Sequence, residues 1–270
     1  MLDEKLINSV FEKLDRYLSE KIVQESPDFY KNEAFLLDGN NLLAVKNPLY
    51  PDINTIIGVE EQKKKLLYNT EKFVQGKPAN NVLLWGERGT GKSSLVKGLL
   101  PVFSKEGLRI IHIQKKDILN IWFLYDLLEG FKDLKFILFL DDLSFEENQT
   151  DYKELKTVID GGLKGIPENI LFYVTSNRKN LIPVRFSDRE SDDTRLSDTV
   201  EEKLSLVDRF GLKLGFFKMS QKTYLEIVDM YAEKFGISVD KDKLYREALR
   251  YALEAGVRNG RVALQFVKSL

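Results

Sequence analysis

The stretch Asn81–Leu100, NVLLWGERGTGKSSLVKGLL, constrains the fold more than any other part of this 270-residue chain. An apolar run leads into a turn with three glycines, and the run after the turn has apolar residues at helical spacing. The turn, Gly86–Ser93, matches the pattern G-x-x-x-x-G-K-[ST]. Glycines let such a loop curl so that successive backbone N–H groups point inward at a polyphosphate. The sequence therefore predicts a strand, a phosphate-binding loop and a helix, in that order.

The side chains of this loop also suit a bound nucleoside triphosphate. Lys92 is long enough to reach the terminal phosphates, and the Ser93 hydroxyl is a ligand for Mg²⁺. A glycine-rich turn with an unrelated lysine is the alternative interpretation, and the flanking strand and helix count against it. The loop residues predicted to contact nucleotide are Gly86, Arg88, Gly89, Thr90, Gly91, Lys92, Ser93 and Ser94.

Short apolar runs alternate with helical patterns through the middle of the chain. Such nearly all-apolar strands are typical of a parallel sheet that helices cover on both faces. The fold class expected is therefore α/β, a parallel sheet flanked by helices. Strands are predicted at 82–85, 109–113, 136–140, 170–174 and 212–217, and helices at 58–73, 93–103, 117–128 and 152–163.

The two ends of the chain differ from this middle part. The N-terminal segment, 1–55, is predicted to hold an amphipathic helix at 3–23 and then an irregular connector interrupted by prolines. The nucleotide-binding α/β domain is assigned to 56–218, with a charged, mobile surface loop at 178–203. Three helical patterns without a strand follow, so 219–270 is predicted to be a small all-helical lid.

Polar side chains stand where two of the predicted strands end. Asp141 and Asp142 follow one strand, and Asn177 follows the next. The carboxyl ends of parallel strands form the edge on which ligands bind. Asp141 is therefore a candidate for the magnesium shell and Asp142 for the base that polarises the attacking water, while Asn177 would contact the γ-phosphate. Solvated acids ending a strand, and an asparagine in a turn, are the alternatives.

The composition excludes several other classes of protein. The 41 basic and 42 acidic side chains give a net charge of -1, so no overall field favours nucleic acid or an anionic membrane. The chain has no cysteine, and no apolar run reaches the roughly 20 residues that span a bilayer. We expect a soluble, cytoplasmic protein that makes no membrane contact.

The order of these motifs resembles that of the AAA+ ATPases. Gly86–Ser93 is similar to the Walker A motif, Phe136–Asp142 to Walker B, and Asn177 lies at the position of sensor 1. The resemblance covers about residues 56–270 and is closest to bacterial AAA+ proteins of largely unassigned role. The stretches that carry this closest resemblance are FLDDLSFEE, YVTSNRKNLIP and VEEKLSLVDRFGLKLGF.

The resemblance implies further site residues and an assembly. Ile56, Ile57 and Gly58 would border the adenine of ATP. Arg209 resembles the arginine finger, which usually reaches a neighbouring subunit's site, and Arg261 resembles sensor 2 in the lid. An ATP-bound homo-oligomer acting on a protein or nucleic-acid client is therefore expected. The alternatives are a structural Arg209, an exposed Arg261 with Arg258 as its substitute, and Arg185, Arg189 or Arg195 as the finger.

The sequence also departs from the family pattern. Walker B usually ends in Asp-Glu, whereas the second acid here is the shorter Asp142, so hydrolysis is expected to be slow unless Glu146 or Glu147 is the base. The loop Gln114–Asp117 lacks the aromatic signature of protein-threading members. Three hypotheses remain: an ATPase coupled to lid and subunit motion, a nucleotide-gated loader or adaptor with little turnover, and a small-molecule kinase.

Overall fold

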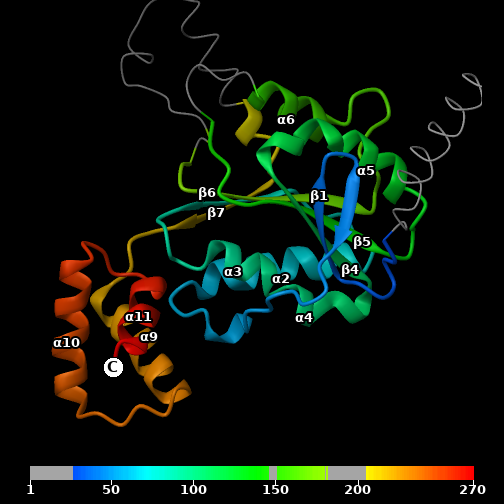
Figure 1. Cartoon of the computed structure of the whole chain (residues 1–270). Helices are drawn as coiled ribbons and strands as arrows, with labels where there is room; N and C mark the ends of the chain where they lie inside the picture. The colour runs from blue at the N-terminus through cyan, green and yellow to red at the C-terminus, as the bar shows by residue number, and fades with distance from the viewer. Residues whose placement is uncertain (1–26, 146–150, 180, 182–204) are drawn as a thin grey trace, which may run out of the picture.

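A computed structural model of the chain describes residues 27–145, 151–179, 181 and 205–270 (Figure 1). Within them, seven strands form one sheet in the order β2-β1-β4-β5-β6-β3-β7. The pairs along this sheet are parallel except for β1 with β2, which confirms the predicted parallel α/β architecture. The strands are β1 Ala34–Asp38, β2 Asn41–Ala44, β3 Val82–Gly86, β4 Leu108–Ile113, β5 Lys135–Leu140, β6 Ile170–Ser176 and β7 Leu212–Phe216.

Helices cover both faces of this sheet (Figure 1). Helices α2 Glu60–Val74, α3 Lys92–Lys97 and α4 Leu100–Phe103 lie on one face, and α5 Ile121–Leu128 and α6 Asp151–Asp160 lie on the other. Three short 3-10 helices complete this part: η1 Ile53–Thr55, η2 Ser104–Glu106 and η3 Lys115–Asn120.

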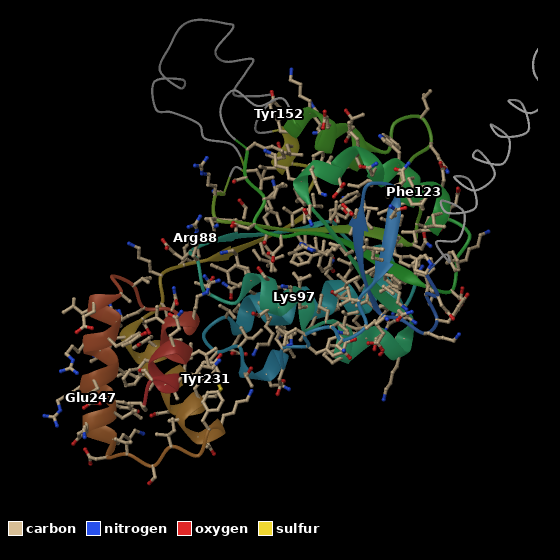
Figure 2. All side chains as sticks on the ribbon, in the orientation of Figure 1. Arg88, Lys97, Phe123, Tyr152, Tyr231 and Glu247 are labelled. Atoms are coloured by element: carbon tan, nitrogen blue, oxygen red, sulfur yellow. The ribbon has the colours of Figure 1, made fainter. Side chains whose placement is uncertain are left out.

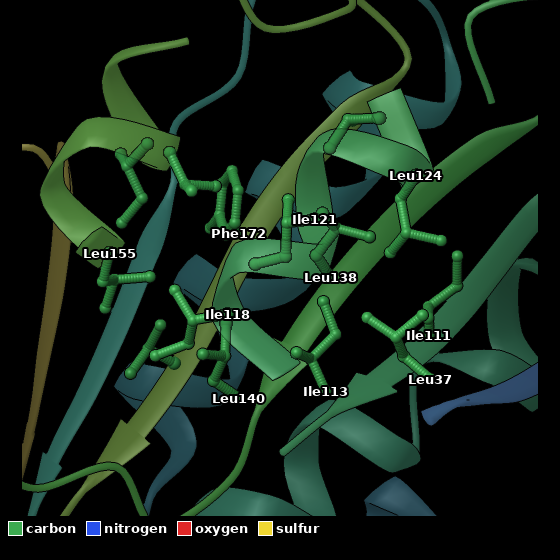
Figure 3. Packing of buried hydrophobic residues seen from close by; sticks show 14 of the residues in the cluster. Leu37, Ile111, Ile113, Ile118, Ile121, Leu124, Leu138, Leu140, Leu155 and Phe172 are labelled. Atoms are coloured by element: carbon green, nitrogen blue, oxygen red, sulfur yellow. The ribbon is translucent and has the colours of Figure 1, made fainter. Parts of the chain in front are cut away.

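The strands are apolar on both faces because each face has its own core. Leu138 and Leu140 of β5 pack among the side chains of α5 and α6 (Figure 3), and Ile137 and Phe139 belong to the cluster on the α2–α4 side. Burying one such side chain contributes about 1.5–3 kcal/mol. Two opposed cores therefore hold the carboxyl ends of the strands in a fixed position at one edge of the sheet.

The prediction of an irregular connector was wrong for residues 34–44, which form the hairpin β1–β2 at the far edge of the sheet. Its turn contains Gly39 at φ +58, and the Gly39 N–H donates to Asp117 Oδ1 at 3.0 Å. The buried Phe35 and Leu37 supply the apolar alternation of a strand. The prolines of this segment flank the hairpin and do not interrupt it, so they do not exclude strand pairing.

The helix predicted at 93–103 is divided into α3 and α4 around Gly98 and Leu99. Gly98 has low helix propensity, and Pro101 has no N–H to donate to the preceding turn. Gly98 also lies close to the connector, since a Cβ there would be 3.0 Å from the Pro51 carbonyl oxygen. The interruption therefore lets Pro51 and Ile53 of the connector pack against the helical segment that follows the glycine-rich loop.

The C-terminal helices α9 Gln221–Lys234, α10 Lys241–Glu254 and α11 Gly260–Lys268 form a separate lid beside the sheet (Figure 1). Their apolar faces share a core of their own that includes Tyr224, Ala248 and Phe266. Side chains cap all three N-termini: Ser220 accepts from Thr223 N, Asp240 from Lys243 N, and Asn259 from Val262 N. The helices match the predicted all-helical lid.

Several sequence predictions lie outside the described residues. They are the helix at 3–23, most of the charged loop at 178–203, the alternative bases Glu146 and Glu147, and the arginines Arg185, Arg189 and Arg195. Within the described ranges, no helix is both long and apolar enough to cross a bilayer.

Gly86, at the end of β3, leaves no room for a larger side chain. Gly86 has φ +128, and a Cβ there would lie 1.9 Å from the Phe216 carbonyl oxygen of β7. We expect Gly86→Ala to destabilise the fold by about 3 kcal/mol or more, because backbone strain and a backbone clash add. Gly76→Ala is the control: Gly76 also has positive φ, +71, but no atom lies near its Cβ. Equal losses of thermal stability in the two variants would contradict the clash.

Candidate nucleotide-binding site

The glycine-rich loop runs from the end of β3 to the start of α3 and lines a cavity of about 640 Å³. Gly89 and Gly91 adopt φ +73 and +95, which non-glycine residues rarely adopt. The Thr90 hydroxyl donates to the Glu87 carbonyl at 2.8 Å and closes the turn. The cavity has the size of a typical small-molecule site. The loop predicted from its glycine pattern therefore surrounds an open pocket.

Ser93 of this loop meets Asp141 of the neighbouring strand end in the same pocket. The Ser93 hydroxyl donates to Asp141 Oδ1 at 2.5 Å, and Thr175 at the end of β6 donates to the same oxygen at 2.6 Å. Lys97 Nζ lies 3.8 Å from the other carboxylate oxygen. The phosphate loop and the acid that ends β5 thus occupy one edge of the sheet, as a shared ligand requires.

The oxygen atoms of Ser93 and Asp141 fit Mg²⁺ chemically. Magnesium is held in proteins by one or two oxygen ligands, with water and substrate phosphates completing its shell. No group of three or more His, Cys, Asp or Glu gathers to bind a metal within the described parts of the chain. The Ser93 and Asp141 oxygens together suit a cation that also takes ligands from a polyphosphate.

Asp142, Asn177 and Lys92 form a second contact group beside Asp141. The Asn177 amide donates to Asp142 Oδ1, and the Asp142 N–H donates to Thr175 Oγ1 at 2.8 Å. Asp142 has φ +51, a conformation that aspartate tolerates better than most side chains. The nearby Lys92 Nζ lies 3.4 Å from Asn177 Oδ1. The predicted base and the predicted γ-phosphate contact are therefore hydrogen-bonded to each other.

Lys92 is 7% exposed, and its ammonium donates to the carbonyls of Gly86 at 2.8 Å and Glu87 at 2.7 Å. Burial lowers the pKa of Lys92, and the charges of Asp142 and Asp141 oppose that effect. The direct partners of the ammonium are neutral carbonyls, so a polyphosphate would add negative charge in contact with it. The surroundings of this lysine favour an anionic ligand.

The other half of the cavity is apolar and is shared between the α/β domain and the lid. Ile56 and Ile57 lie on its lining, as the adenine prediction expects. The same lining includes residues that no sequence motif marked: Pro51, Thr55, Met219, Ile227, Tyr231 and Leu264. Figure 2 places Tyr231 on the lid, and burial raises the pKa of its phenol. Ile227 and Tyr231 have the same helical spacing as the lid core, so no local pattern distinguished them from it.

Arg261 also lies on the cavity lining, at the first turn of α11. Its predicted substitute, Arg258, is directed to Gln221, with Nη1 3.4 Å from Oε1, and is not on the lining. The lid thus brings Arg261 to the same pocket as Lys92 and Asp141.

Three predicted residues do not lie on this lining. Gly86 contributes through its carbonyl to Lys92, and Gly58 instead packs under the lid, where a Cβ would lie 2.3 Å from Thr223 Cγ2. Arg209 lines a different cavity with Asn81, Lys135 and Ile170, at the amino ends of the strands. Its guanidinium binds both oxygens of Asp160, at 2.5 and 2.7 Å. A role for Arg209 in a neighbouring subunit stays a prediction.

Comparisons with known proteins support this fold. A family model described as "Protein of unknown function (DUF815)" matches residues 30–270, and no match was found among curated proteins. AMPPCP-bound DnaA from Aquifex aeolicus overlaps with a TM-score of 0.52 at 19% identity, covering 82% of this chain and 66% of that chain. The crystal structure of a DNA replication initiation factor overlaps with a TM-score of 0.50 at 20% identity, covering 83% and 64%. These overlaps show that the chain shares the fold of these two proteins.

Proposed function

We propose that this chain, which belongs to the DUF815 family of proteins of unknown function, binds ATP with Mg²⁺ and hydrolyses it. One observation supports this most: the loop serine and the strand-end acid are hydrogen-bonded in one cavity with Lys92. Loop amides and Lys92 would hold the β- and γ-phosphates. The apolar half of the cavity, which is shared with the lid, would hold the adenine ring of ATP. Ser93 and Asp141 would hold Mg²⁺, which supplies charge neutralisation on the phosphate oxygens.

In the proposed reaction a water molecule attacks the γ-phosphorus, and the bond to the β–γ bridging oxygen breaks to give ADP and phosphate. Asp142 would accept the proton of the attacking water, and Asn177 would orient that water or the γ-phosphate. Arg261 would contact the γ-phosphate from the lid of the same subunit. Arg209 would contact it from a neighbouring subunit in an ATP-bound homo-oligomer.

The proposed cycle moves the lid, since the cavity has one wall on each unit. Loss of the γ-phosphate would remove the contact to Arg261 and relax the lid. We propose that this motion, passed between subunits in the cytoplasm, acts on a protein or nucleic-acid client. The kinase hypothesis is weaker, because Arg261 and Leu264 of the lid occupy a wall on which a kinase would bind its acceptor.

A slower version of this function, a nucleotide-gated loader or adaptor, is favoured by the contacts of Asp142. Its carboxylate already accepts a hydrogen bond from Asn177, and it is one methylene shorter than a glutamate. A base held in this way is less available to water. Under this alternative, ATP binding alone would set the lid and recruit a partner.

Steady-state phosphate release by Asp142→Asn tests the assignment of the base. We expect turnover about 10²-fold below the unsubstituted chain, because a general base typically contributes 10²–10⁴-fold. ATP affinity should stay within a few-fold, since the amide keeps the size of the side chain. Asp126→Asn, on an exposed part of α5 away from the cavity, is the control. Unchanged turnover in Asp142→Asn would reject this residue as the base, and no turnover in any preparation would favour the loader.

A further inference from the structure

The turn that begins α11 binds the outer side of the phosphate loop. Asn259 Nδ2 donates to the Arg88 carbonyl at 3.2 Å, and the Gly260 N–H donates to the Gly89 carbonyl at 3.1 Å. Asn259 is 7% exposed, so this contact between the lid and the α/β domain is buried. Since Arg261 follows directly, we infer that Asn259 is a positioning residue that fixes Arg261 over the nucleotide pocket. This inference rests on the proposed function for its effect on turnover.

The Asn259 side chain makes two contacts, and only one of them caps the helix. Its Oδ1 accepts from the Val262 N–H at 2.9 Å, as an N-cap does, while its Nδ2 makes the contact with the loop. The caps of the other lid helices, Ser220 and Asp240, use an oxygen acceptor in the same way. Serine, aspartate and asparagine cap about equally well. The amide nitrogen therefore serves the loop contact and is not required by the helix.

The phosphate loop is shaped for this contact at Gly89. A Cβ on Gly89 would lie 2.5 Å from Asn259 Cγ, closer than any side chain tolerates. Gly260 also lies close to the loop, with an added Cβ 3.5 Å from the Gly89 carbonyl oxygen. The glycine that lets the loop curl thus also admits the lid asparagine.

The two hydrogen bonds link the conformation of the loop to the position of the lid. Loop N–H groups would bind the phosphates of the proposed nucleotide, whereas the carbonyls of Arg88 and Gly89 accept hydrogen bonds from the lid. A change in the loop on nucleotide binding therefore moves the atoms that hold α11. Coupling of this kind is reciprocal, so a lid displaced from the loop also weakens the response of the loop to ATP.

Asn259→Asp tests this role because it keeps the cap and replaces the donor with an acceptor. We expect kcat to fall about 10-fold with KM for ATP changed less than about 3-fold, since an interaction made through Arg261 acts on the transition state. Arg261→Ala should lower kcat as well, and Asn259→Asp should add little in the Arg261→Ala background, because coupled residues are not additive. Independent, multiplicative losses would overturn the inference.

Asp240→Ala is the matched control for lid stability. It removes the cap of α10, and Asp240 does not line the nucleotide pocket. We expect it to lower thermal stability while kcat and KM stay unchanged. If Asp240→Ala lowers kcat as much as Asn259→Asp does, the effect is general loosening of the lid, and the positioning role is rejected.

A distance measurement separates failure of this inference from failure of the proposed function. The chain has no cysteine, so spin labels attach only where cysteines are introduced. We choose Tyr68→Cys on α2 and Leu253→Cys on α10, because these side chains are 65% and 81% exposed. In nucleotide-free protein we expect one narrow distribution of distances between spin labels, broadened by Asn259→Asp and not by Asp240→Ala. That result without any ATP turnover would support the positioning contact and reject the ATPase. An unbroadened distribution would overturn the inference.

Discussion

Lys92→Ala is expected to abolish nucleotide binding, weakening the affinity for MgATP by more than about 100-fold. The ammonium is buried at the mouth of the phosphate loop, where it contacts only carbonyl and amide oxygens and lies near two carboxylates. Charge-assisted contacts to phosphate are about twice as strong as neutral hydrogen bonds, and Lys92 is buried whereas Arg88, the other cation of the loop, is exposed. Isothermal titration with MgATP measures the loss.

Lys97→Ala is the matched control for this variant. Lys97 lies 3.8 Å from Asp141 but is not on the cavity lining, so its loss should change the affinity only slightly. The Lys92 ammonium also stabilises the empty loop through the Gly86 and Glu87 carbonyls, so the thermal stability of both variants must be compared. Tight MgATP binding by a folded Lys92→Ala protein would contradict the proposed site.

Arg209→Ala is expected to lower turnover by about 10³-fold while sparing ATP binding, since an arginine finger acts on the charge of the transition state. Mixing this variant with Asp142→Asn should restore part of the activity. In a mixed assembly, an intact site of one subunit can receive Arg209 from its neighbour. Phosphate release measured over a range of mixing ratios gives the recovery.

The ion pair with Asp160 provides the control that this experiment needs. Arg209 contacts both Asp160 oxygens and the Ser205 carbonyl, so its removal also disturbs the end of α6. Asp160→Asn breaks the ion pair and leaves the arginine in place, and it should retain turnover. If Asp160→Asn and Arg209→Ala lose turnover equally, or the mixture does not recover, Arg209 is structural.

The site was predictable from the sequence where its chemistry depends on a local pattern. The loop, Asp141 and Asn177 each follow a strand directly, and parallel strands bring their carboxyl ends together whatever else the chain does.

The parts that sequence did not reveal depend on tertiary contacts. Ile227 and Tyr231 of the apolar half of the cavity have the same helical spacing as the lid core, so only the packing of the lid against the sheet distinguishes them. The hairpin β1–β2 was hidden because each strand is short and its register depends on β4, which is distant in the sequence. Asp160 was not foreseen as the partner of Arg209, since the two are 49 residues apart.

The apolar walls of the cavity come from both the α/β domain and the lid, and this division has a kinetic consequence for a bound nucleotide. A bound purine would touch Ile56 and Ile57 on one side and Tyr231 on the other, so its departure would be slower while those surfaces remain together. Product escape would then be limited by how often the two units part, rather than by the strength of any single contact. A partner that binds the lid would therefore control the rate of ADP release without contacting the phosphate loop.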